Sequence, residues 1–128
     1  MSGRTSRRKP YVSRDPLVFL EDIEKGCAKV VRYTEGRSKD DVFRDEVRLD
    51  AVLLNLHVIG EAVKKLPADL RERYQEVAWR EIAGLRDFIA HAYFALDLDI
   101  IWDAIERDVP ALLDAVRRII ATEKAGRT

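Results

Sequence analysis

The residues best suited to chemistry lie close together, in the stretch that runs from Gly84 to Tyr93. Arg86 is followed five residues later by His91, and Tyr93 comes two residues after that. A histidine titrates near neutral pH and can give or take a proton, while the planar guanidinium of arginine binds two phosphate oxygens at once. On residue types alone, a salt-bridged arginine and a histidine near a helix C-terminus are the more common explanation.

Helical segments must position these residues, because the apolar residues recur at helical spacing and none of the chain shows the alternation of a half-buried strand. The first segment begins at Asp15 and Pro16, a capping side chain followed by proline at the first helical position, and Gly36 ends it. The second segment begins at Ser38 and ends before Pro67, and we expect it to be one long helix.

Two further helical segments complete the pattern. Trp79 opens the third, which carries Arg86 and His91, after a polar connector over residues 68–78. The fourth follows a capping residue at Asp97, and Pro110 should kink it or break it in two. Short loops favour antiparallel neighbours, so we expect an all-α fold, an up-and-down bundle of four to five helices.

The charge distribution separates a basic tail from an acidic body. Among 128 residues, the 23 basic and 23 acidic side chains balance, but five of the basic ones precede Asp15 and leave residues 15–128 with a net negative charge. We expect a flexible basic tail at 1–14, one helical domain at 15–122 and a flexible C-terminus at 123–128. A broadly basic nucleic-acid-binding surface is excluded, so RNA contacts must come from a local patch or from the tail.

The cysteine content and the lengths of the apolar segments indicate the cellular compartment of the protein. The single cysteine, Cys27, cannot form an internal disulfide, and no Cys/His spacing fits a zinc site, so no metal and no cofactor are expected. No apolar run approaches the ~18 residues that span a bilayer, and no secretory signal follows the basic N-terminus. We therefore expect a cytoplasmic protein without membrane contact.

The spacing of Arg86, His91 and Tyr93 resembles the motif of HEPN domains, and its His-x-Tyr ending resembles HepT toxins in particular. Asp87 departs from the family pattern, in which the residue after the arginine is most often asparagine. Other matches lie on both sides of the motif and extend the resemblance to roughly residues 15–120: residues 59–62, 79–82 and 98–102, Asp108 and Pro110.

This resemblance implies a homodimeric, metal-independent endoribonuclease toxin that cleaves mRNA or tRNA in a cleft lined by both copies of the motif. Arg86 would bind the scissile phosphate, and His91 would act as general acid or base. Tyr93 would contact the substrate and accept AMP from a cognate MntA-like nucleotidyltransferase antitoxin. An alternative of a different class is a non-catalytic interaction partner of a minimal nucleotidyltransferase, and a third is a plain helical interaction protein.

Helix geometry constrains how the motif can work. Residues five apart point about 140° away from each other in an ideal α-helix, so Arg86 and His91 do not share a face. Either the helix ends near His91, or the site combines two protomers. Arg86 shares its face with Ala83, Ala90 and Tyr93, and we expect this face to line the dimer cleft.

Three other polar residues have two interpretations each. Asp87 precedes His91 by four residues, so it would either raise the histidine pKa or form an exposed ion pair of small energy. Glu61 would either orient Arg86 from the facing helix or be a solvated charge. His57 lies among apolar residues, and we expect it to be packed or partly buried rather than catalytic.

Overall fold

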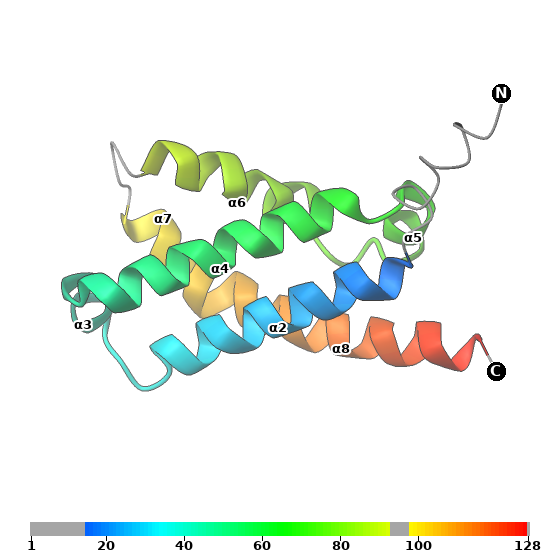
Figure 1. The fold of residues 1–128 in the computed structure, drawn as a ribbon, viewed down its shortest axis with the longest axis horizontal. Helices are drawn as coiled ribbons and strands as arrows, with labels where there is room; N and C mark the ends of the chain where they lie inside the picture. Colours follow the sequence, from blue (N-terminus) through cyan, green and yellow to red (C-terminus); the bar gives the residue numbers. More distant parts are fainter. Residues whose placement is uncertain (1–14, 93–97, 128) are drawn as a thin grey trace, which may run out of the picture.

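The computed structural model describes the backbone of residues 15–92 and 98–127 and, within these ranges, every side chain except those of residues 86–88 and 90–92. The described residues form helices and no strand, which confirms the all-α prediction (Figure 1). The elements are α2 (Pro16–Thr34), α3 (Lys39–Arg44), α4 (Glu46–Lys65), α5 (Ala68–Arg73), α6 (Trp79–Ala92), α7 (Leu98–Asp103), a π-helical turn η1 (Ala104–Asp108) and α8 (Val109–Ala125). None of these described helices is long and apolar enough to cross a membrane.

The four long helices α2, α4, α6 and α8 run alternately up and down, as predicted (Figure 1). α4 packs against both α2 and α6, and α8 packs against α2. Apolar side chains from all four helices fill the core, among them Leu20, Leu56, Ile89 and Val116. Burying one such side chain contributes about 1.5–3 kcal/mol. Because α4 lies between its neighbours, it is the helix that positions α6.

The first helix begins and ends as the sequence predicts. Asp15 is extended, and its Oδ1 accepts a hydrogen bond of 2.9 Å from the backbone N–H of Leu17. Gly36 has φ of 72°, a left-handed conformation that glycine adopts without steric cost, and the chain turns there.

The segment between Ser38 and Pro67 forms two helices, so the prediction of one long helix there was wrong. Ser38 caps the short α3, with its Oγ accepting from Asp41 N–H at 3.1 Å. Asp45 is extended and starts a new helix, with its Oδ1 accepting from Arg48 N–H at 3.1 Å. An aspartate that bonds a nearby backbone N–H favours a helix start over a helix interior. Arg48 then ties the new helix back to α2 through a 2.8 Å bond to the Tyr33 carbonyl.

The kink or break predicted at Pro110 takes the form of a π-helical turn just before the proline. α7, η1 and α8 follow one another directly, and Val109 N–H bonds the Ala104 carbonyl five residues back. Proline lacks an N–H and its ring clashes with the carbonyl four residues earlier, so a regular α-helix cannot continue through Pro110 unchanged. The chain bends at η1 (Figure 1). The capping role expected for Asp97 lies outside the described residues.

Both ends of this helical run are fastened. At α7, Trp102 packs edge-on against Phe43, with ring centroids 5.9 Å apart. At the other end α8 continues to Ala125, and Arg127 makes bonds of 2.6 and 2.7 Å to Asp15. The start of α2 is therefore tied to the end of α8.

Candidate active site

Helix α6 is placed by its first turn and by one buried side. Trp79 starts the helix, as predicted, and its Nε1 donates a 3.0 Å bond to the Tyr74 carbonyl. Trp79, Ile82 and Ile89 are buried in the core. Gly84, in contrast, is exposed. α6 therefore has an inner side that faces the core and an outer side that faces solvent.

The register of α6 places the two motif positions on different sides. Position 86 comes four residues after Ile82 and three before Ile89, on the inner side. Position 91 comes seven residues after Gly84, on the outer side. The side chains of Arg86, Asp87 and His91 lie outside the description, and Tyr93 lies outside the described residues altogether. One copy of α6 thus does not bring positions 86 and 91 to a common side.

The inner side near Ala83 is occupied by the chain itself. Ala83 is half-buried and packs against the core cluster. The neighbouring helix at this point is α4 of the same chain. The small residue at position 83 therefore makes contact within its own chain.

Two polar residues of α4 line one hollow on the surface. Glu61 is half-buried with its Oε2 buried, so it is not a fully solvated charge. His57 is exposed, so the prediction that it is packed or partly buried was wrong. It follows the buried Leu56 and is turned about 100° from it, away from the core. The hollow has a volume of about 270 Å³, and Phe19, Asp22, Val58, Ala62 and Lys65 complete its lining.

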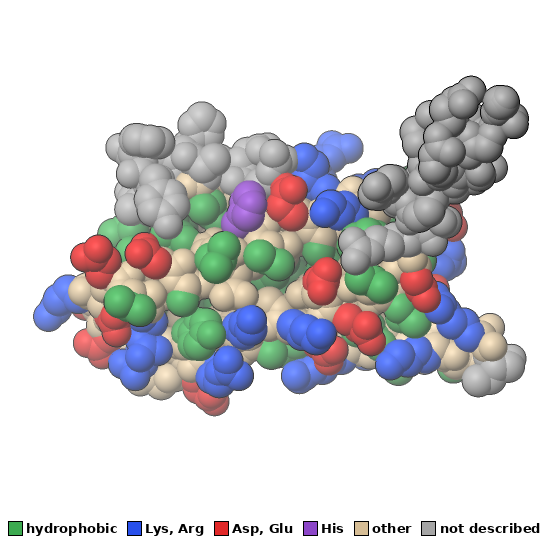
Figure 2. Space-filling view, viewed as in Figure 1, with side chains coloured by type: hydrophobic (Ala, Val, Ile, Leu, Met, Phe, Trp, Pro, Cys, Tyr) green, Lys and Arg blue, Asp and Glu red, His purple; other side chains and the backbone are tan. Residues whose placement is uncertain are grey.

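An exposed apolar stripe follows the outer side of α4. It consists of Val47, Leu54 and Val58, which are 80%, 61% and 38% exposed and are spaced seven and four residues apart. This spacing places all three on one side of the helix. Apolar side chains gather over α4 in Figure 2. Contiguous exposed apolar surface is typical of a site of protein contact.

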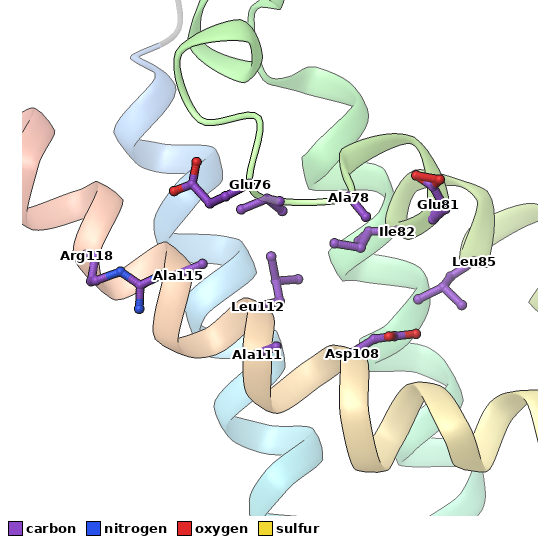
Figure 3. Close-up of a pocket in the computed structure, with 11 residues that line it drawn as sticks. Glu76, Ala78, Glu81, Ile82, Leu85, Asp108, Ala111, Leu112, Ala115 and Arg118 are labelled. Atoms are coloured by element: carbon purple, nitrogen blue, oxygen red, sulfur yellow. The ribbon is translucent and has the colours of Figure 1, made fainter.

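A larger cavity lies between α6 and α8 (Figure 3). This α6–α8 groove has a volume of about 580 Å³. Its apolar lining consists of Val77, Ala78, Ile82, Leu85, Ala111, Leu112 and Ala115. Its charged residues are Glu76, Glu81, Asp108 and Arg118. Burial, reinforced by the neighbouring Asp103 charge, raises the pKa of the Asp108 carboxyl.

Sequence reasoning missed this groove. Its lining comes from the connector before α6, from α6 itself and from η1 and α8, and these segments share no motif. Near the start of α6 the sequence offers only Glu76 and Glu81, five positions apart, and isolated acidic residues of this kind are common on solvated helices.

Comparison with known proteins assigns the chain to a family. The family model described as "Ribonuclease HepT-like" matches residues 23–119, which include all of α6. The chain belongs to the HepT-like ribonuclease family. Membership confirms the family resemblance drawn from the motif and places the chain among ribonucleases.

Relatives of this HepT-like chain come from bacteria and archaea. A protein of Caldanaerobacter subterraneus subsp. tengcongensis, named a candidate RNase, is 39% identical over 111 residues, which cover 87% of this chain and 99% of the relative. One of Methanocaldococcus jannaschii, also named a candidate RNase, is 36% identical over 84% of this chain and 88% of its own length. A Thermococcus cleftensis protein named a probable ribonuclease HepT is 35% identical over 73% of this chain and 86% of its own length. No solved structure matches the chain significantly.

Proposed function

We propose that this HepT-like chain is the toxin of a toxin–antitoxin system and cleaves mRNA or tRNA as a metal-independent endoribonuclease in the cytoplasm. The observation that carries the proposal is the placement of an arginine and a histidine, at positions 86 and 91, on a helix within the region matched by a ribonuclease family model. Arg86 binds the scissile phosphate, and His91 moves a proton. Asp87 and Glu61 are positioning residues in this proposal.

The chemistry needs more than one copy of the motif. The 2′-hydroxyl attacks the adjacent phosphorus while a base removes its proton, and an acid protonates the 5′-oxygen as the P–O bond breaks. A guanidinium stabilises the extra charge on the pentacoordinate phosphate. Acid and base must be in opposite protonation states at the same moment, and each chain has one motif histidine. Two His91 residues across a two-fold axis supply both roles.

The outer side of α4 offers a surface for the second copy. The apolar stripe of Val47, Leu54 and Val58 lies on the helix that packs against α6. Two chains that bury this stripe against each other bring two copies of α6 close to one cleft. Leu54→Asp should therefore give monomers in sedimentation and abolish RNA cleavage. Leu54→Met, which keeps the stripe apolar, should remain a dimer and cleave RNA. Full cleavage by a monomeric Leu54→Asp variant would exclude a shared site.

The decisive test is the rate of RNA cleavage by His91→Ala and Arg86→Ala in the presence of EDTA. Each variant should lose ~10²–10⁴ in rate, because proton transfer or phosphate stabilisation is removed. His57→Ala is the matched control, since His57 is exposed on α4 and has no assigned role. Parental cleavage by His91→Ala would overturn the assignment. In the alternative, a non-catalytic partner of a nucleotidyltransferase, the parental chain cleaves nothing and does not arrest growth when expressed alone.

We propose that Tyr93 is the residue through which the antitoxin neutralises the toxin. Transfer of AMP to its hydroxyl by a cognate MntA-like nucleotidyltransferase would put bulk and phosphate charge beside Arg86 and compete with RNA for that cation. Tyr93→Phe should escape neutralisation when the two proteins are expressed together, while Tyr33→Phe should be adenylylated and neutralised like the parent. Intact-protein mass spectrometry counts the adenylate groups. An adenylate on Tyr93→Phe would move the modification to another residue.

A further inference from the structure

The bundle of four long helices is open on one of its sides. α2 packs against α4, α4 against α6, and α8 against α2, whereas the α6–α8 groove separates α6 from α8. In a closed bundle of alternating helices, each helix buries its apolar side against two neighbours. The apolar surface that α6 and α8 would bury against each other therefore remains as the floor of the groove.

The groove has the length and the floor that a further helix needs. Ile82 from α6 and Leu112 from α8 form the middle of the floor (Figure 3). Ala111 is exposed on the α8 side, and so small a side chain lets a third helix come close. Along α8 the lining extends from Asp108 to Arg118, which corresponds to about 15 Å, or about ten residues of a helix that lies alongside.

The charges of the groove are distributed unevenly between its two ends. α6 and α8 run in opposite directions (Figure 1), so Glu76 and Arg118 lie at one end, and Glu81 and Asp108 lie at the other (Figure 3). The first end is balanced. The second end, called the acidic end below, has two carboxylates and no cation in its lining. A ligand with a positive charge at one end and apolar groups beside it complements this pattern.

The described part of the chain supplies no cation to the acidic end. Within residues 15–92 and 98–127, no ion pair or hydrogen bond engages the side chains of Glu81 and Asp108. The neighbouring Arg107 pairs with Asp103 at 3.3 Å instead. Burial and the Asp103 charge raise the pKa of Asp108, because this carboxylate lacks sufficient positive charge around it.

The exposed apolar residues of the chain itself do not complement the acidic end. Leu54 on α4 follows Asp50 by one helical turn, and Ile100 on α7 precedes Asp103 by about one turn. A second copy that inserted either segment would bring a further carboxylate toward the groove. The α4 stripe, moreover, already serves the proposed contact between two copies. The chemistry of the groove therefore favours a different protein as its partner.

We propose that the α6–α8 groove binds an amphipathic helix of a partner protein, which closes the open side of the bundle. Two apolar side chains of this helix, one turn apart, cover Ile82 and Leu112. A lysine or arginine in the next turn lies between Glu81 and Asp108. Binding of a helix in a groove uses apolar anchors at spacings of three and four residues, and the cation fixes the direction of the helix. This inference does not depend on the proposed chemistry of the motif.

Fluorescence anisotropy of the full chain with a labelled model peptide tests the proposal. The peptide is an alanine-rich helix of about fourteen residues, with two leucines four positions apart and two lysines in the turn that follows them. It should bind saturably, with a dissociation constant of ~10–100 µM. Glu81→Lys/Asp108→Lys should weaken binding about tenfold or more, because two attractive contacts become repulsive.

The matched control for charge is Glu35→Lys/Asp114→Lys, which changes the net charge equally at exposed positions outside the groove. It should change the affinity less than about twofold. Circular dichroism checks that each variant stays folded. An equal loss of affinity in both double variants would show that the peptide responds to net charge alone and would overturn the proposal.

A bulky side chain in the groove tests the shape of the site. Ala111→Trp should weaken peptide binding about fivefold or more, because the indole occupies the space of the leucines. Ala121→Trp is the matched control, since Ala121 is exposed on α8 outside the lining, and it should bind the peptide like the parent.

Three outcomes would overturn the proposal. The first is no saturable binding of the peptide by the folded parent at concentrations up to about 1 mM. The second is equal binding of a scrambled peptide in which the leucines no longer share one side. The third is a parental dimer that Ala111→Trp converts to monomers in sedimentation, which would assign the groove to a second copy of the chain.

Discussion

Two pairs of helices in this protein pack in different ways. α2 and α4 are in close contact, whereas α6 and α8 leave a groove between them. At the first, Gly26 lies so close to α4 that an added Cβ would be 2.8 Å from Ile59 Cγ1. At the second, about 580 Å³ stays open between the helices. A closed contact specifies the fold through shape, whereas an open one leaves apolar surface for a ligand or for another part of the chain.

Large-to-small substitutions should separate the two regions most strongly. Ile59→Ala should cost about 2–5 kcal/mol in the free energy of unfolding, because the cavity it leaves is enclosed. Leu85→Ala, at a half-buried position of the groove, should cost less than about 1 kcal/mol, because the space it opens is already accessible. Urea unfolding gives both values. Equal losses would mean that the groove is as tightly packed as the α2–α4 contact.

Two glycines should respond in opposite directions. Gly26→Ala should destabilise the protein by about 1–3 kcal/mol, since the new methyl group must displace the buried Ile59. Gly84→Ala should stabilise it by about 0.5–1 kcal/mol, because nothing lies within 4 Å of the added Cβ and alanine favours the helix. Thermal unfolding measures both shifts. Stabilisation by Gly26→Ala would show that α2 and α4 can separate without loss.

A smaller effect is expected at the ion pair that fastens α2 to α8. The Arg127 guanidinium and the Leu17 N–H lower the pKa of Asp15 from 3.8 to about 2. A folded pKa below the unfolded value adds stability that is present above pH 3.8 and is lost as the pH falls toward about 2. Arg127→Ala should raise the Asp15 pKa in an NMR titration and flatten acid unfolding in that window.

The control for this titration is Arg107→Ala, which removes an exposed pair with Asp103 and is not among the groups that shift the pKa of Asp15. It should leave the Asp15 pKa as it is in the parent. An unchanged Asp15 pKa in Arg127→Ala would assign the shift to the helix cap at Leu17 instead.

The reactivity of cysteine thiols should distinguish the α2–α4 contact from the α6–α8 groove, with no appreciable change in the stability of the protein. Burial raises the pKa of Cys27, next to Gly26, to about 12, so almost no thiolate is present at pH 8. Its reaction with a disulfide reagent should therefore follow unfolding. A cysteine placed in the groove by Ala111→Cys, at an exposed position, should react within the native state. Rapid labelling of Cys27 in the folded parent would indicate that the α2–α4 side opens readily.

Much of the fold was predictable because helix ends depend on local chemistry. Asp15, Gly36, Pro67 and Trp79 mark ends or starts that the structure places where the sequence indicates. The break at Asp45 was not predicted, since an aspartate at a helix start and one on an exposed helix face look alike in sequence. Local rules favour both positions, and tertiary contacts such as the Arg48 bond to Tyr33 decide between them.

The candidate site was predictable only where one segment carries it. The spacing of Arg86 and His91 lies within one helix and could be analysed by register, while the exposure of His57 depends on which side of α4 the core covers. The α6–α8 groove depends on residues more than thirty positions apart, from Glu76 to Arg118, and on a helix pair that does not close. Periodicity predicts which side of a helix is buried but not how far two helices stand apart.

The π turn at η1 joins α7 to α8 directly, so that the two helices form one bent unit. One arm, α7, is anchored beside α3 by the Trp102–Phe43 contact, and the other, α8, lies along α2. Since no loop separates the arms, neither can slide or rotate without turning the other. Removing one residue from 104–108 would rotate α8 by about 100° relative to α7, so that the Trp102–Phe43 contact and the packing of α8 on α2 could no longer form together.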